Sequence, residues 1–170
     1  MRVTSGTEIV MGKRSEALAA RIEQGADGLA AFAEGLSDSE WQRVVPPDGR
    51  TVGVIIHHVA SVYPIEIQLA STLAEGKAIS GVTWTGIAEM NAGHAKEHAA
   101  VGKAETVALL RQNSREAARA VRAMADEVLD RAAPVSLNAD APLTAQFFIE
   151  DHALRHSFHH LAKIRGALGK

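Results

Sequence analysis

The stretch that decides the fold is KRSEALAARIEQGADGLAAFAEGL, residues 13–36. Its apolar residues recur at intervals of three and four positions, the spacing that lines one face of an α-helix. Most of the positions between them are polar, charged or small. We therefore predict an amphipathic helix over residues 13–36, with a buried face formed by Leu18, Ile22, Ala26, Leu29, Ala33 and Leu36.

A second helix is predicted over residues 51–76, after the turn sequence Pro46-Pro47-Asp48-Gly49. Thr51 is a suitable N-cap, because its side-chain oxygen can accept from a backbone N–H of the first turn. Pro64 lies well inside this segment and lacks a backbone donor, so we expect a kink there. The expected buried face consists of Ile55, His58, Val62, Ile65, Leu69 and Leu73.

Two more long helices are predicted in the second half of the chain. The third begins near Lys103 and ends before Pro134, and the fourth runs from Pro142, in its first turn, to Leu168. A short helix over residues 87–99 precedes the third. The connection over residues 76–106 is longer than a minimal helix–helix turn, so we expect it to form a crossover or lid over one end of the bundle.

The composition agrees with an all-helical fold. Hydrophobic residues make up 46% of the 170 residues, but much of that is Ala, and aromatic residues are only 4%. Such a chain favours helices over β-sandwiches and barrels. We predict an all-α protein with one domain over residues 1–170, an antiparallel four-helix bundle with a long helical crossover or lid between helices 2 and 3.

Charge and cysteine content exclude several classes of protein. The formal net charge is −2 and no basic block is present, which argues against nucleic-acid binding. The absence of Cys excludes disulfides, thiolate zinc sites and a Cys nucleophile. The N-terminus lacks the apolar core of a secretion signal, and the uncharged stretch over residues 51–65 is too short to span a bilayer. We expect a soluble cytoplasmic protein that binds neither nucleic acid nor membranes.

The informative feature is the content of eight His residues. His58 follows the apolar register of the second helix. His156 and His160 are four positions apart on an apolar, small-residue face of the last helix, where their Cβ atoms lie ~6 Å apart. Three imidazoles would thus enter one bundle interior. A divalent metal can share their lone pairs, with nitrogens at ~2.0–2.1 Å. The alternative is a set of hydrogen-bonded structural histidines.

Other polar and aromatic residues are weaker candidates for the same site. Glu66 lies near the core edge of the second helix, where it is either a pocket carboxylate (a base or a support for a ligand) or an ordinary ion-paired residue. Asn91, Trp84 and Trp41 can line a cavity mouth, although Trp is more often a core residue. The remaining His are expected on more polar helix faces (His57, His152 and His159) or on an exposed face (His94 and His98).

Three segments together resemble the DinB/YfiT-like superfamily, whose members are regarded as metalloenzymes. The segments are IIHHVASVYPIE (55–66), EMNAGHAKEHA (89–99) and DHALRHSFHHLAKIRGALG (151–169), and the most specific pattern is H-S-x-H-H-x-x-x-I in the last. The resemblance places the family's metal triad on His58, His156 and His160. It also places Asn91 near the pocket, and His159 at a family position that is not usually a ligand.

The resemblance implies a divalent ion, zinc or nickel, and a homodimer. The family's known activities use a low-molecular-weight thiol as cosubstrate, as in the bacillithiol transferases and the mycothiol-dependent maleylpyruvate isomerases. Our first hypothesis is therefore a metal-dependent thiol transferase or hydrolase acting on a small electrophilic molecule, with Glu66 or Asn91 orienting or deprotonating the nucleophile. The alternatives are a non-catalytic bundle that binds a metal or small ligand, and an interaction module with a structural His triad.

Overall fold

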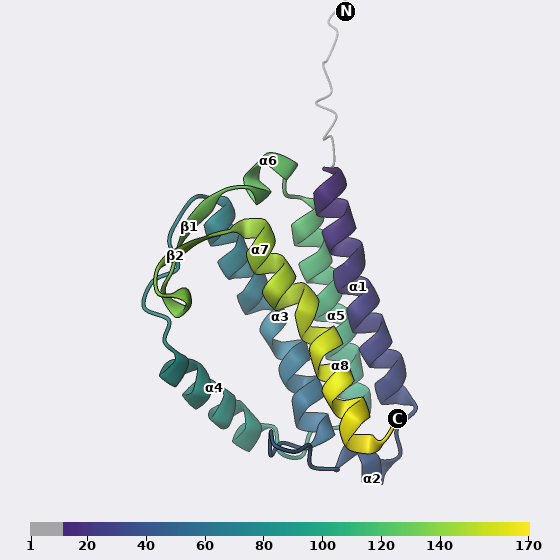
Figure 1. Ribbon diagram of the computed structural model, residues 1–170. Coiled ribbons are helices and arrows are strands. Elements are labelled where there is room, and N and C mark those ends of the chain that lie inside the picture. The colour runs from purple at the N-terminus through teal and green to yellow at the C-terminus, as the bar shows by residue number, and fades with distance from the viewer. Residues whose placement is uncertain (1–11) are drawn as a thin grey trace, which may run out of the picture.

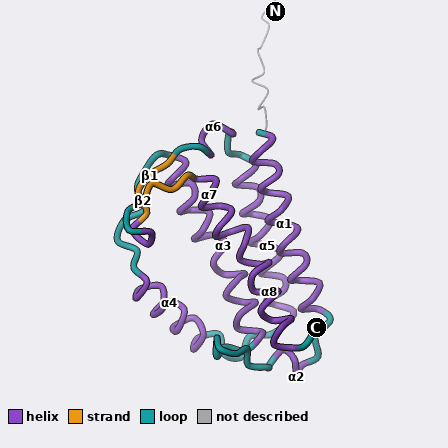
Figure 2. Tube along the Cα trace, viewed as in Figure 1, coloured by secondary structure: helices purple, strands orange, loops and turns teal. Residues whose placement is uncertain are grey.

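The structure is a computed structural model that describes residues 12–170 (Figure 1). Residues 1–11 lie outside the described part. The start of the predicted domain and most of the N-terminus that we expected to lack a secretion signal fall within these residues. Helices make up most of the described chain, with one small hairpin (Figure 2). The elements are α1 (Lys13–Glu34), α2 (Asp38–Trp41), α3 (Val52–Ala74), α4 (Trp84–Glu97), α5 (Lys103–Arg122), α6 (Asp126–Leu129), β1 (Ala132–Val135), a 3₁₀ turn (Ser136–Asn138), β2 (Ala141–Thr144), α7 (Ala145–Ile149), a π-helical turn (Glu150–Leu154) and α8 (Arg155–Leu168).

Four long helical segments form one bundle, namely α1, α3, α5 and the segment from α7 to α8. Helix α5 packs against both α1 and α3, and α8 contacts the same two helices. Arg111 of α5 pairs with Glu34 and Arg122 pairs with Glu16, so α1 and α5 are antiparallel. Helix α4 carries the chain back along the bundle, so α5 runs in the same direction as α3 (Figure 1). The predicted four-helix bundle with a helical crossover is confirmed. The packed helices α3 and α5 are parallel rather than antiparallel, because the crossover returns along the bundle.

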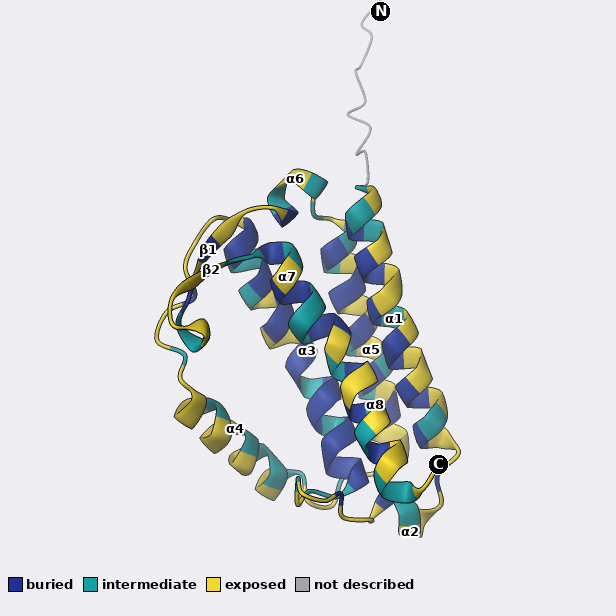
Figure 3. Cartoon of the chain, viewed as in Figure 1, coloured by how far each residue is buried: buried dark blue, intermediate teal, exposed yellow. Residues whose placement is uncertain are grey.

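The predicted apolar faces meet in the centre of the bundle (Figure 3). Every residue of the face predicted for 13–36 is buried. Small residues let α1 and α8 approach closely, since a Cβ at Gly25 would lie 2.7 Å from the ring of Phe158. On α3 the prediction holds less well, because Ile65 is 46% exposed and Leu69 is only partly buried.

Helix α3 continues through Pro64 without interruption. Proline has no N–H to donate to the carbonyl four residues earlier, which is that of Ala60. The side-chain amide of Asn113, on α5, donates to this carbonyl oxygen at 2.8 Å. Ala60 is fully buried, so its carbonyl needs a partner within the protein. The neighbouring helix α5 supplies the donor that Pro64 lacks.

The second half of the chain differs from the prediction at its element boundaries. The third long helix ends at Arg122, well before Pro134. The chain then turns back, and the Asp126 carboxylate accepts from the first N–H groups of α1, those of Arg14 and Ser15. Pro142 lies in strand β2 opposite Pro134, and not in a first helical turn. The last helical segment begins after Thr144, whose hydroxyl caps Phe147 N–H.

Helix α3 is the most apolar element. By length and composition it could cross a membrane, but 67% of its most apolar window is buried inside the protein. This burial is the property of a core helix, and it matches the position of α3 between α5 and α8.

Candidate metal centre

Three imidazole rings converge on one side of the bundle. His58 comes from α3, and His156 and His160 come from α8. Each offers a ring nitrogen within 4.8 Å of the other two. The ring centroids lie 5.1 Å (His58–His156), 5.8 Å (His58–His160) and 4.9 Å (His156–His160) apart. The three rings chosen from the helical register therefore do lie together.

Local structure explains why these rings share one space. His156 and His160 are four residues apart and stack, with 22° between their planes. The π-helical turn directly before α8 inserts an extra residue per turn and so rotates the face that α8 presents, as such turns often do near functional sites. A buried hydrogen bond of 2.7 Å between the hydroxyls of Tyr63 and Ser157 sets α8 in register with α3.

Glu66 lies directly behind one of the rings. Its Oε1 atom is 2.6 Å from Nδ1 of His156, and its Oε2 atom is buried without a hydrogen-bond partner. A carboxylate that accepts from Nδ1 fixes the ring orientation and leaves Nε2 with a free lone pair, an arrangement common behind metal-bound histidines. In the structure, Glu66 therefore holds the His156 ring in position.

Burial keeps the other two rings neutral. Burial, reinforced by His156, lowers the pKa of His58 to about 3 and that of His160 to about 2. Nδ1 of His160 is buried and has no partner. The site therefore presents neutral imidazoles with unshared lone pairs, the donor set that divalent zinc and nickel accept. The residues fit a divalent cation.

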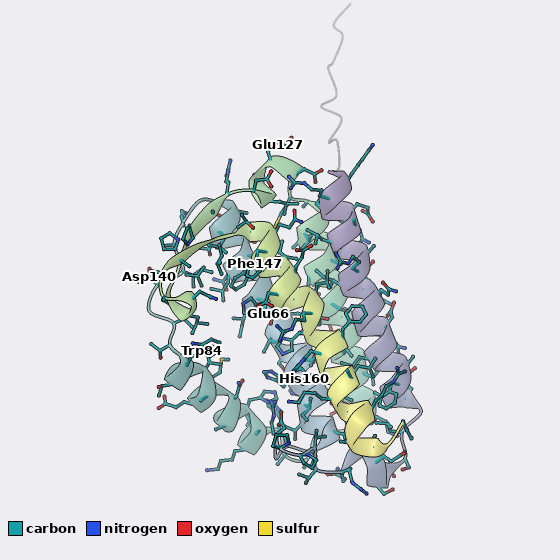
Figure 4. All side chains as sticks on the ribbon, viewed as in Figure 1. Glu66, Trp84, Glu127, Asp140, Phe147 and His160 are labelled. Carbon is teal, nitrogen blue, oxygen red and sulfur yellow. The ribbon has the colours of Figure 1, made fainter. Side chains whose placement is uncertain are left out.

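The three rings form part of the wall of a pocket with a volume of about 330 Å³. Glu66 and His160 lie on the bundle side of this region, and Trp84 lies across from them on α4 (Figure 4). The rest of the wall is largely apolar and is contributed by α3, α4, α7 and the segments around the hairpin: Val62, Ile65, Leu69, Ile79, Val82, Ile87, Met90, Val135, Leu137 and Phe148. The partial exposure of Ile65 and Leu69 is therefore exposure to this pocket.

Asn91 also lines the pocket, and its Oδ1 atom is buried without a partner. The two Trp residues differ. Trp84 is 68% exposed and lines the pocket, whereas Trp41 is a core residue whose Nε1–H donates to the carbonyl of Val101 at 3.0 Å. From the sequence, each Trp could have been either a residue of the cavity mouth or a core residue.

Three charged residues that the sequence did not reveal, Asp48, Arg50 and Lys163, also line the pocket. Arg50 donates to Asp48 from Nε at 2.5 Å and from Nη2 at 2.8 Å, and Lys163 lies 3.4 Å from the same carboxylate. The Arg50 guanidinium holds the pKa of the Asp48 carboxyl well below its usual range. Nη1 of Arg50 is buried without a partner. Asp48 and Arg50 follow no helical register, so their meeting with Lys163 depends on the tertiary fold.

Five His lie outside the triad. His94 and His98, expected on an exposed face, are half-buried against His57, where burial lowers the pKa of His94 to about 4. His152 stacks on Phe148 at 4.1 Å and lines the pocket, although we expected it on a polar face. His159 is exposed, as expected.

Comparisons with known proteins agree with this description. Residues 21–164 match the sequence profile of the DinB superfamily. The fold is similar to that of YfiT from Bacillus subtilis, described as a probable metal-dependent hydrolase with an unusual four-helix bundle topology. The TM-score is 0.73 at 16% sequence identity, over 98% of this chain and 91% of that chain. No curated protein sequence matches.

Proposed function

This chain belongs to the DinB superfamily, and on that premise we propose that it is a metal-dependent enzyme acting on a small electrophilic molecule. His58, His156 and His160 would hold one divalent cation, zinc or nickel, at the wall of the pocket. The observation that carries the proposal is the convergence of three imidazole nitrogens within 4.8 Å beside a pocket of about 330 Å³. A divalent ion bound there supplies Lewis-acid chemistry and lowers the pKa of a bound water or thiol.

The protein's own residues define what happens around that ion. Glu66 holds the proton on Nδ1 of His156 and so keeps Nε2 available as a ligand atom. The unpartnered Oδ1 of Asn91 can accept a hydrogen bond from a substrate N–H or O–H group. The apolar walls displace water from the substrate and strengthen these polar contacts. The nucleophile is either water, giving a hydrolase, or a low-molecular-weight thiol, giving a transferase.

The test compares metal content and activity in matched variants. We expect His160→Ala to lose one equivalent of divalent metal, measured by elemental analysis of the purified protein, relative to the wild type. His159→Ala changes an exposed neighbour on the same helix and should retain the wild-type content. An unchanged content in His160→Ala would refute the metal site.

Activity assays separate the classes of function. Ester and amide hydrolysis without added thiol identifies a hydrolase, and thiol-dependent conversion of electrophiles identifies a transferase. In either case the activity should disappear in His160→Ala and persist in His159→Ala. Stoichiometric metal with no turnover across both substrate panels would contradict catalysis and leave a metal-binding bundle.

A further inference from the structure

Helix α4 is placed unlike the other long helices. It has no buried residues, and it contacts the bundle through α3 (Figure 1). An element that buries no apolar side chain gains little from the hydrophobic effect. Its position must therefore depend strongly on a small number of side-chain contacts.

The contact between α4 and α3 includes a second group of three imidazoles. His94 lies in the last turn of α4 and His98 directly follows the helix as its C-cap, and both face His57 of α3. The ring centroids lie 4.0 Å (His57–His98), 4.6 Å (His94–His98) and 5.0 Å (His57–His94) apart. Each ring offers a nitrogen within 4.8 Å of the other two. All three are half-buried, which leaves the group accessible to an ion.

The polar atoms of this group are only partly satisfied within the protein, where the Ser61 hydroxyl lies 3.3 Å from Nδ1 of His57. Nδ1 of His57 and Nε2 of His94 lie 2.8 Å apart, so one donates to the other. Nδ1 of His94 is buried and has no partner. A neutral imidazole has one donor and one acceptor, and one His–His hydrogen bond cannot use the lone pairs of three rings. A single cation can use all three.

We propose that His57, His94 and His98 form a second divalent transition-metal site, one that fastens α4 to α3. Imidazole ligands select zinc, nickel or copper over magnesium and calcium. None of these three residues is among those that line the pocket, so this donor set is separate from the triad. The two sites are neighbours, since the His94 ring meets the His58 ring edge-on at 5.7 Å.

Metal binding at the second site would also affect the pocket. Helix α4 contributes Trp84, Ile87, Met90 and Asn91 to the pocket wall. An ion that joins α4 to α3 holds this wall in place, and its loss frees the wall to move. The second site therefore acts on substrate access and positioning without contact with the reacting groups.

Metal stoichiometry tests the proposal. The full chain is stripped with a chelator, reloaded with excess Zn²⁺, desalted and analysed for zinc per protein. We expect two equivalents in the wild type and in His159→Ala, and one in the double variant His94→Ala/His98→Ala. His160→Ala should also retain one equivalent. Because α4 buries no residue, the double variant should fold, which circular dichroism checks.

The outcomes distinguish this site from the triad. One equivalent in the wild type that is lost in His160→Ala, but kept in the double variant, overturns the second site and leaves the proposed function intact. Two equivalents in the double variant also overturn it. The reverse pattern, with metal lost only in the double variant, supports the second site and contradicts the triad.

Hydrogen exchange provides a readout that is independent of stoichiometry. Zn²⁺ should slow amide exchange across residues 84–97 at least several-fold in the wild type and in His160→Ala. The conservative variant His98→Gln and the double variant should show no such slowing. Equal slowing in all four proteins, or no slowing in the wild type, would overturn the second site.

Discussion

Glu66 holds the ring of His156 through a hydrogen bond of 2.6 Å, and this contact makes a specific prediction for a single residue. Glu66→Gln keeps the shape of the side chain but removes the charge that favours a proton on Nδ1. We expect zinc affinity at the triad to fall about 10- to 100-fold, the usual effect of losing a partner behind a metal-bound histidine. Competition with a chromophoric chelator measures this change.

The matched control for that substitution is Glu127→Gln, which alters an exposed carboxylate on α6 far along the chain. It should bind zinc as the wild type does. If Glu66→Gln also retains full affinity, then Glu66 does not support the ligand His156, and its place beside the ring is structural.

The sequence located part of this site and missed the rest for a physical reason. His58, His156 and His160 could be identified because helical register alone fixes which face they occupy. Register also placed Glu66 near the core edge, but it could not show which ring the carboxylate meets. Asp48 and Arg50 belong to a loop, and the pairing of His57 with α4 depends on how a separate helix docks. Neither arrangement is encoded in local spacing.

Among the elements, α3 shows how a proline is accommodated in a core helix. The amide of Asn113 satisfies the Ala60 carbonyl that Pro64 leaves without a donor. We expect Asn113→Ala to lower the free energy of unfolding by about 1–3 kcal/mol, the cost of leaving a buried acceptor unpaired. Urea unfolding measures it, and Gln112→Ala, an exposed neighbour, should change stability by less than about 0.5 kcal/mol.

A double-mutant cycle shows whether the two positions act together. Pro64→Ala restores an N–H that can donate to the Ala60 carbonyl within α3. In that background Asn113→Ala should cost markedly less than it does alone. Additive effects would contradict the coupling, because independent sites add.

Helix existence was predictable here, and helix boundaries were less so. The apolar periodicity of α1 and α3 is strong, and both were placed within a few residues of their observed ends. The hairpin β1–β2 was not predicted, because four-residue strands are too short to show a clear alternation. Proline in the first turn is a common helix start, but Pro142 pairs in a strand instead.

For the whole molecule, the histidines make stability depend on pH. Burial holds the pKa of His58 at about 3 and that of His160 at about 2, whereas an unfolded imidazole has a pKa near 6.5. Below pH 6.5 the unfolded chain therefore binds protons that the folded chain does not, and stability falls as the pH falls. The effect should be about 1.4 kcal/mol for each of these two rings at pH 5.5.

Urea unfolding of the chelator-treated protein between pH 7.5 and 5 checks this direction. Removing one of the two rings in His160→Gln should make the dependence on pH shallower. A free energy of unfolding that stays constant from pH 6.5 to 5 would contradict the prediction. Four other rings have a lowered pKa as well, and burial is the main cause in each: His57, His94, His152 and His159.

The path of the chain could not be read from periodicity. Four amphipathic helices fit several arrangements equally well, and the direction of α5 depends on whether the preceding connection returns along the bundle. Helix α4 makes that return, and it does so outside the core. The sequence indicated the length of the connection between α3 and α5, but not its path along the outside of the bundle.

That route has an evolutionary consequence. The bundle keeps its shape through α1, α3, α5 and α8, whereas α4 forms one side of the pocket and shares none of the buried interior. Substitutions on α4 therefore cost folding little, and those at the residues that line the pocket reshape what it admits. Proteins with this fold can therefore change their ligand preference through substitutions in α4 alone, while the four-helix bundle stays the same.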